Sequence, residues 1–228
     1  LENVYKNSKL ILDETIDSAF ASSVSCIEEN NTLGTVYIDI GGGSSKIATY
    51  FNGCLEYVNY IPLGGNDVTN DIENGLEISK ELAEYIKVIH GDLEFSSNKK
   101  INIDMSNGSN KTITQNLLHG IIKPRYEEIF EIIRDKLDDN LITKMGINKI
   151  ILTGGVSQAN GLKRLSEKIF NRETNIVFPK TDLKGLKNRP EFSTVFGLMK
   201  IKANPKLRKI MKLQTNNKIS NVIEKFDT

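Results

Sequence analysis

The strongest constraint on the fold is a run of three short strands separated by turns that are rich in glycine. Apolar residues alternate with others over 36–40, and three glycines follow at 41–43. A second strand is predicted over 46–51, and Asn52-Gly53 then gives the strongest short hairpin signal in the chain. With a third strand predicted over 55–61, the pattern indicates a three-stranded meander.

The remaining segments alternate between helical and strand-like patterns, which favours an α/β sheet. The predicted helices cover 3–29, 69–75, 79–90, 114–141, 161–170 and 190–203, and further strands are predicted over 149–153 and 175–178. Leu82, Ile86 and Ile89 share one helical face, and Pro124 predicts a kink or a restart in its helix. The polar residues 92–113 predict a short β excursion with loose turns.

The composition is that of a globular protein with little net charge. A length of 228 residues with 39% hydrophobic content is enough for one large domain or two small ones. Thirty basic and 29 acidic residues give a net charge of +1, which argues against a nucleic-acid partner. The charge is uneven, because 200–228 carry eight basic and two acidic residues, and the basic character is concentrated in this tail.

Cysteine content and hydropathy exclude two further classes of protein. Cys26 and Cys54 are too few for a disulfide framework, and we expect a reducing compartment and two small core residues. No apolar run approaches the roughly 18–20 residues that a membrane-spanning helix needs. A secreted disulfide-rich scaffold and a membrane-spanning protein are therefore not expected.

Residues 39–45 read Asp-Ile-Gly-Gly-Gly-Ser-Ser and place a carboxylate at the end of an apolar strand. Glycines let backbone N–H groups approach an oxyanion closely, and the two hydroxyls add donors. Asp39 is placed to hold a magnesium ion, directly or through water, because this ion prefers oxygen ligands. The alternative is a glycine-rich hairpin with a solvated aspartate, and the motif is neither a Walker loop nor a GxGxxG loop.

Two further motifs each have an ordinary structural interpretation. Gly154 and Gly155 end a predicted strand, which is where ligands of open α/β sheets bind, although a tight strand-to-helix turn would look the same. Glu84 and Lys87 are neighbours on one helix face. They form either an exposed ion pair or a polar pair that reaches a sugar hydroxyl and a base edge.

Apart from Asp39, the sequence contains no motif that indicates a metal site or a serine hydrolase. His90 and His119 stand apart from any cluster at metal-ligand spacing, so structural roles are expected for both. No Gly-x-Ser-x-Gly segment exists to supply the nucleophile of a serine hydrolase.

Taken together, the motifs have an order and spacing that resemble the second half of actin-like ATPases, and most closely the FtsA family. The matching segments are Asp-Ile-Gly-Gly-Gly-Ser-Ser at 39–45, Pro-Leu-Gly-Gly-Asn-Asp-Val-Thr-Asn-Asp-Ile at 62–72, Ala-Glu-x-Ile-Lys-x-x-x-Gly at 83–91 and Leu-Thr-Gly-Gly at 152–155. Residues 65–72 and 122–130 favour FtsA over its relatives. The second stretch is similar to the family's Ile-Glu-Pro-Arg-Tyr segment, with Lys123 in place of the usual Glu.

The resemblance runs from about Ala19 to about Leu198 and implies a fold and a domain organisation. The implied fold is α/β, an actin-like (ribonuclease H-like) ATPase fold, of which this chain holds the second major domain with a small inserted α+β lobe. The implied divisions are a helix from the end of the first domain at 1–33, the second domain at 34–203 with 92–141 as its smaller lobe, and a basic linker with an amphipathic tail at 204–228.

The resemblance also implies ATP and magnesium as cofactors. Asp39 would position magnesium and its water, Glu84 and Lys87 would face the ribose and the adenine, and Gly154-Gly155 would lie under the adenosine. The phosphate clamp would consist of Gly41, Gly42, Gly43, Ser44, Ser45 and Lys46. Because the other phosphate loop belongs to the first half of the fold, residues 1–228 are expected to bind ATP weakly or not at all by themselves, with at most a slow ATPase activity.

In function, the resemblance implies a cell division protein that anchors the FtsZ ring to the cytoplasmic face of the membrane at the division site and helps recruit later division proteins. Implied partners are copies of itself in filaments and the C-terminal peptide of FtsZ, with Lys123 and Arg125 near the peptide. The apolar face of the tail would contact lipid, and this face consists of Ile219, Val222, Ile223 and Phe226.

Two alternatives from the same superfamily stay open. A small-molecule kinase or phosphotransferase would need a catalytic carboxylate in a first half, and the Pro-Arg-Tyr helix and the basic tail argue against it. A chaperone-like ATPase should continue into a peptide-binding domain, for which the roughly 30 residues after Gly197 are too few.

Overall fold

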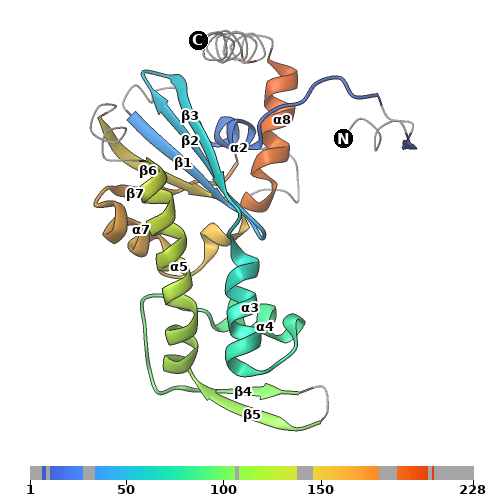
Figure 1. Ribbon diagram of the computed structural model, residues 1–228, viewed down its shortest axis with the longest axis vertical. Helices are drawn as coiled ribbons and strands as arrows, with labels where there is room; N and C mark the ends of the chain where they lie inside the picture. Colours follow the sequence, from blue (N-terminus) through green and yellow to red (C-terminus); the bar gives the residue numbers. More distant parts are fainter. Residues whose placement is uncertain are drawn as a thin grey trace, which may run out of the picture.

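The computed structural model describes residues 7–8, 11–27, 34–105, 108–137, 146–179, 189–204 and 207 of the 228-residue chain. A five-stranded sheet forms the centre, in the order β3-β2-β1-β6-β7 (Figure 1). The strands are β1 (Gly34–Ile40), β2 (Ser45–Phe51), β3 (Cys54–Ile61), β6 (Ile147–Thr153) and β7 (Glu173–Ile176). Strand β1 pairs antiparallel with β2 and parallel with β6, so the sheet is mixed.

The predicted meander is confirmed. Strands β1, β2 and β3 follow one another in antiparallel register, and β2 is joined to β3 through Asn52 and Gly53. Both turn residues have positive φ, 50° at Asn52 and 77° at Gly53, as the tight hairpin turn of type I′ requires. The sheet therefore begins from a locally encoded unit.

Helices cover both faces of this sheet (Figure 1). They are α2 (Ser18–Cys26), α3 (Gly65–Leu76), α4 (Lys80–His90), α5 (Gln115–Leu137), α7 (Leu162–Phe170) and α8 (Ser193–Ala203), with short 3₁₀ helices η1 (Gly155–Gln158) and η2 (Pro190–Phe192). Of the described helices, none combines the length and the apolar character needed to cross a membrane.

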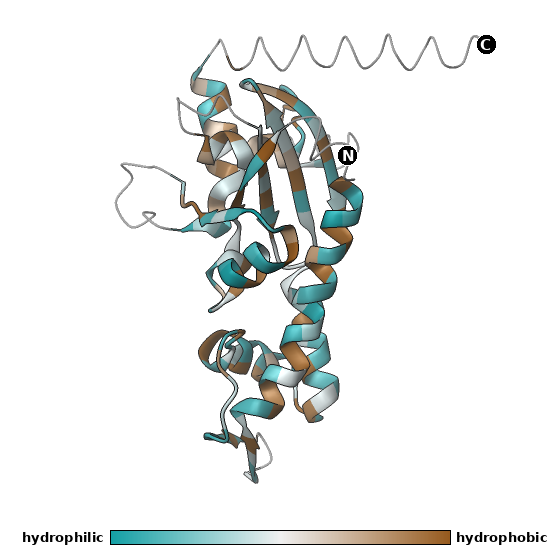
Figure 2. Cartoon of the chain, turned by 90° about the vertical axis from the view of Figure 1, so that its left-hand side faces the viewer, coloured by the Kyte–Doolittle hydropathy of each residue, from teal (hydrophilic) through white to brown (hydrophobic). Residues whose placement is uncertain are grey.

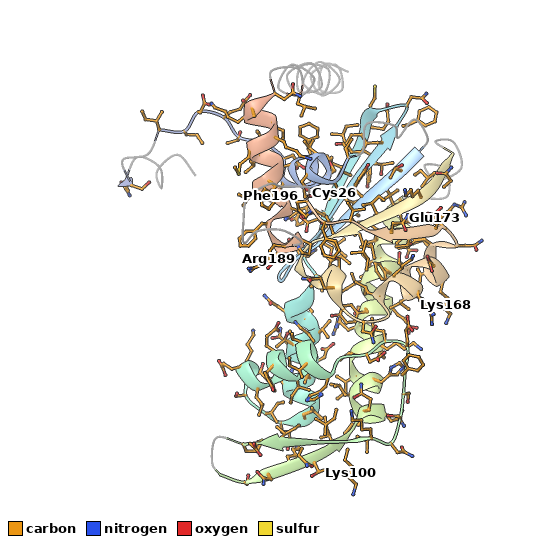
Figure 3. All side chains as sticks on the ribbon, turned by 180° about the vertical axis from the view of Figure 1, so that it is seen from behind. Cys26, Lys100, Lys168, Glu173, Arg189 and Phe196 are labelled. Carbon is orange, nitrogen blue, oxygen red and sulfur yellow. The ribbon has the colours of Figure 1, made fainter. Side chains whose placement is uncertain are left out.

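Alternating side chains of the strands serve two separate cores. Val36, Ile38 and Ile40 of β1 belong to the core that α5 and α7 cover, while Tyr37 belongs to the core under α2 and α8. Figure 2 shows the corresponding alternation of hydrophobic and hydrophilic residues along the elements. On the second face, Phe196 of α8 and Cys26 of α2 lie in the region where these two helices meet (Figure 3).

A smaller lobe lies below the sheet in Figure 1 and contains α3, α4, the N-terminal part of α5, and a hairpin of β4 (Lys100–Asp104) and β5 (Asn110–Thr114). The polar stretch before α5 does form the expected β excursion, with Ile101, Ile103 and Ile113 turned into the core. Lys100 marks the far end of this lobe in Figure 3. Besides the hairpin and α5 from the predicted segment 92–141, the lobe includes α3 and α4.

Three predicted helix features differ from the structure. Helix α2 begins only at Ser18, not near residue 3, because the Asp17 carboxylate accepts hydrogen bonds from the amides of Ala19 and Phe20 and caps it there. Helix α3 begins at Gly65, four residues before the prediction, since the Asp67 carboxylate accepts from Gly64 N. Helix α5 runs through Pro124 as one continuous helix, which excludes the restart that was one of the two predictions there.

Two apolar residues that the sequence analysis singled out lie on the surface, and of these only Cys54 was expected in the core. Helix α4 buries Ala83 and Ile86, which turns Ile89 outward with 56% of its surface exposed. Cys54 is exposed because it follows the tip of the β2–β3 hairpin, beyond the covering helices. Cys26 is buried as expected, and burial raises the pKa of its thiol.

Candidate functional site

A cavity of about 990 Å³ lies where the strand ends of the sheet meet the smaller lobe. Its walls come from the end of β1, the glycine loop after it, the first turns of α3 and α8, helix α4, and the turn after β6. The predicted cofactor residues that line it are Asp39, Gly41, Gly42, Lys46, Glu84, Lys87, Gly154 and Gly155. Gly43, Ser44 and Ser45 are not among the lining residues.

The glycine loop is anchored to α3 through its carbonyl groups. Gly41 O accepts from Gly65 N at 3.0 Å and Gly42 O accepts from Asn66 N at 2.7 Å. Gly64 permits this approach, because a Cβ there would lie 2.4 Å from Gly41 O. With its carbonyls turned toward α3, the loop can direct other backbone N–H groups toward an anion in the cavity.

The two serines of the predicted clamp have different surroundings. Ser45 is buried, and its hydroxyl donates to Leu63 O at 2.8 Å. Ser44 O accepts from Gly41 N and closes the loop. The structure thus gives both serines a part in holding the loop in shape.

The turn after β6 comes close to Asp39. Gly154 has φ of +86°, and a Cβ there would lie 2.4 Å from Asp39 Oδ1 and 2.5 Å from Ile40 O. Gly155 opens η1 and has no such restriction, since its Cβ would meet Glu191 Cβ at 3.5 Å. Gly154 is therefore required by its positive φ and by the close approach to Asp39. Gly155 is not restricted in this way, and its lack of a side chain leaves open space beside the cavity.

Glu84 and Lys87 form an ion pair that also ties α4 to α3. Lys87 Nζ donates to Glu84 Oε2 at 2.6 Å, to Thr69 Oγ1 at 2.8 Å and to Gly65 O at 2.9 Å. The ammonium is nearly buried with 10% of its side chain exposed, while the Glu84 side chain is 48% exposed. Burial alone would raise the pKa of Glu84, but hydrogen bonds from Lys87 and Thr69 outweigh it, and the net shift is downward.

Asp39 is the most buried charged group of the cavity, with 6% of the residue exposed. Its Oδ2 accepts from Lys46 Nζ at 3.2 Å and from Thr194 Oγ1 at 3.3 Å. Thr194 comes from α8, 155 residues further along the chain.

The surroundings of Asp39 do not favour direct coordination of the expected magnesium ion. Magnesium demands nearly ideal octahedral oxygen coordination, and the available carboxylate oxygen already faces an ammonium group. Throughout the part of the chain that the structure describes, no three His, Cys, Asp or Glu side chains are grouped to hold a metal ion. The ammonium therefore argues against direct coordination of magnesium by Asp39 Oδ2, and the indirect role in positioning magnesium and its water stays a prediction.

Several lining residues carried no separate prediction. Gly65 and Asn66 lie within the segment that supported the family resemblance, so their position next to the glycine loop could have been inferred from it. Thr194 has no local signal, because only the packing of α8 brings it to Asp39. Asp92 and Asn160 also line the cavity and bond to each other at 2.8 Å across the two lobes.

The predicted partner residues lie outside this cavity. Arg125 is held by Asp71, with Nε–Oδ2 and Nη2–Oδ1 distances of 2.6 Å and 3.0 Å, and by Glu128 at 2.5 Å. These contacts raise the pKa of the guanidinium and link α5 to α3. Lys123 lies half-buried on the same helix. The predicted membrane residues Ile219, Val222, Ile223 and Phe226 lie outside the described residues.

The structural roles expected for the two histidines stay predictions, and only the surroundings of His119 fit such a role. His119 Nδ1 is 2.9 Å from Asp92 O, and His90 ends α4 beside the cavity.

Comparisons with solved structures identify the fold. The chain superposes on MreB5 of Spiroplasma citri, in a crystal structure bound to AMPPNP, with a TM-score of 0.69 and 20% identity, over 95% of this chain and 65% of that chain. It also matches a chain of the PilM–PilN type IV pilus biogenesis complex, with a TM-score of 0.64 and 18% identity, over 86% of this chain and 55% of that one. These likenesses show the predicted actin-like α/β fold.

Comparisons of sequence identify the family. The family model described as "Cell division protein FtsA" matches residues 36–197. The cell division protein FtsA of Neisseria meningitidis serogroup B is 34% identical over 180 residues, which is 75% of this chain and 43% of that protein. The FtsA protein of Escherichia coli K12 is 30% identical over 204 residues, or 83% of this chain and 49% of that protein. The chain thus spans about half the length of the curated relatives it matches, and it belongs to the FtsA family of cell division proteins.

Proposed function

We propose that this chain forms one side of an ATP-binding cleft in an actin-like division protein that attaches the FtsZ ring to the membrane. The observation that carries the proposal is the cavity itself, in which the glycine loop, the Gly154-Gly155 turn and the Glu84–Lys87 pair face a common space. Such a combination of backbone donors, bare glycine surface and a few polar side chains is typical of a nucleotide site.

Each part of the cavity has a role in this proposal. The glycine loop offers backbone N–H groups to the phosphates, and the flat surface at Gly154 and Gly155 supports the nucleoside. The half-exposed carboxylate of Glu84 accepts a hydrogen bond from a ribose hydroxyl. ATP hydrolysis is at most slow, because Asp39, the buried carboxylate nearest the glycine loop, is held in an ion pair.

The isolated 228-residue chain is expected to bind ATP weakly, with a dissociation constant well above about 1 μM, because only one side of the cleft contributes contacts. Glu84→Gln should weaken binding by about threefold to tenfold, since the hydrogen bond to a half-exposed carboxylate is only partly shielded from water. Titration with a fluorescent ATP analogue measures both effects.

Glu81→Gln is the matched control for this titration, because Glu81 lies on the same helix but does not line the cavity. Submicromolar binding by the isolated chain would contradict the half-cleft. Equal affinities of the Glu84 and Glu81 variants would remove Glu84 from the nucleotide site.

We also propose that the smaller lobe receives the C-terminal peptide of FtsZ near Lys123. Lys123→Glu should weaken peptide binding and reduce its dependence on salt, because a charge pair with an acidic peptide is lost. Arg125→Ala should instead lower the free energy of unfolding by about 1 kcal/mol, since Asp71 and Glu128 lose their shared partner.

Peptide binding measured by fluorescence anisotropy separates these two roles. Lys136→Glu, in the last turn of the same helix, is the control for a change of net charge. An affinity that Lys123→Glu and Lys136→Glu change equally would exclude a specific contact at Lys123.

A third part of the proposal concerns the tail. Residues 200–228 carry a net charge of +6, and four apolar residues from Ile219 to Phe226 repeat at helical spacing. The tail is expected to bind anionic lipid, with about 1 kcal/mol from each basic residue near the surface. In sedimentation with anionic vesicles, the full chain should pellet with the vesicles, and a chain that ends at Asn217 should stay in the supernatant. Equal sedimentation of the two would place the anchor elsewhere.

A further inference from the structure

The ion pair between Asp39 and Lys46 lies inside the cavity, where the sequence suggested a metal ion. Lys46 Nζ is 3.2 Å from Asp39 Oδ2, and only 7% of the aspartate side chain and 22% of the lysine side chain are exposed. Both residues line the cavity. The carboxylate nearest the glycine loop thus already has a cation beside it.

The architecture of the sheet fixes this pair. Asp39 of β1 and Lys46 of β2 are direct partners in the antiparallel register, and side chains in such positions project from the same face. Thr194 from the first turn of α8 adds a third group, with its Oγ1 at 3.3 Å from Asp39 Oδ2 and at 3.5 Å from Lys46 Nζ. Two strands and a helix therefore hold the ammonium in place.

The other lysines of the cavity are less suited to meet phosphate at the glycine loop. Lys87 Nζ donates to three groups, namely Gly65 O, Thr69 Oγ1 and Glu84 Oε2, which uses its three N–H donors. Lys99 belongs to the smaller lobe and is exposed. Lys46 has two protein acceptors among the described residues, so a third N–H can face a ligand.

We propose that Lys46 takes the place of a divalent cation in this cavity, so that nucleoside polyphosphate binds here without a requirement for magnesium. The inference rests on the nucleotide site proposed above. The ammonium, oriented by Asp39 and Thr194, donates a charge-assisted hydrogen bond to a phosphate oxygen beside the glycine loop. It also neutralises Asp39, whose bare carboxylate would repel the phosphates.

The test measures ATP binding by the 228-residue chain with NMR titrations, which detect weak affinity, in EDTA and in excess magnesium. The unsubstituted chain should have the same dissociation constant in both conditions within about twofold, because the ammonium supplies the charge. Lys46→Met keeps the aliphatic stem and should lose about tenfold in affinity in EDTA. Magnesium should restore much of this loss, because the freed carboxylate of Asp39 can then hold the hydrated ion.

Two further variants show whether a loss of ATP affinity comes from the missing charge or from a damaged fold. Lys149→Met removes a half-buried strand lysine outside the cavity and should bind ATP like the unsubstituted chain in both conditions. The double variant Asp39→Asn with Lys46→Met leaves no unpaired carboxylate, so it should fold well and show no gain from magnesium.

The outcomes distinguish this inference from the proposed function. ATP binding by the unsubstituted chain that falls at least about tenfold in EDTA overturns the role of Lys46 and leaves the nucleotide site standing. A Lys46→Met chain with unchanged affinity in EDTA also overturns it. If the unsubstituted chain binds no ATP in either condition, the weak ATP binding proposed for this half of the cleft is wrong, and this inference fails with it.

Discussion

Gly197→Ala is expected to lower the free energy of unfolding by about 3 kcal/mol, the upper end of the cost of overpacking a core. Gly197 lies in α8, and a Cβ there would be 1.6 Å from Ala21 O and 2.4 Å from Ala21 C in α2. These atoms are backbone, so they cannot move aside by changing a rotamer. The two helices would have to separate along the contact that covers one face of the sheet.

Gly120→Ala is the matched control for this change. Gly120 also lies within a helix, α5, but no atom lies within 4 Å of the position that its Cβ would take. Alanine should therefore stabilise the protein by up to about 1 kcal/mol through helix propensity. Urea unfolding followed by circular dichroism measures both variants. Equal effects of the two substitutions would show that the α2–α8 contact is not close-packed at Gly197.

Gly154→Ala is the second change with a large expected effect, on stability and on nucleotide binding together. An alanine at φ of +86° is strained, and its Cβ would collide with Asp39 Oδ1 and Ile40 O. Strain and collision together should cost about 2–3 kcal/mol of stability. Relief of the collision would displace the Asp39 carboxylate from Lys46, so affinity for ATP should fall by at least about tenfold.

The neighbouring substitution Gly155→Ala supplies the comparison. Its Cβ would make ordinary van der Waals contact with Glu191 Cβ at 3.5 Å, so the free energy of unfolding should change by less than about 1 kcal/mol. Thermal unfolding should therefore separate two adjacent glycines of one motif. A Gly154→Ala chain as stable as the Gly155→Ala chain would contradict the close approach of the turn to Asp39.

The sequence by itself determined the elements whose signals are local. Alternating apolar residues and the Asn52-Gly53 turn encode the β1–β3 meander, since strand period and positive φ depend on neighbouring residues only. The spacing of the glycine motifs similarly identified the glycine loop and the Gly154-Gly155 turn, and both line the cavity. The resemblance that these motifs carry was enough to predict the fold and the family.

Only the tertiary structure decided which groups meet across the chain. Helix α2 begins at the Asp17 cap, a boundary that hydrophobic periodicity does not predict. Arg125 pairs with Asp71 because α5 packs on α3. The character of the candidate site changed most. From its motif alone, Asp39 was predicted to hold a metal ion. Strand register sets Lys46 opposite it, and α8 brings Thr194 from 155 residues away. A carboxylate's chemistry depends on the charges within a few ångströms of it, and strand register together with packing selects those charges.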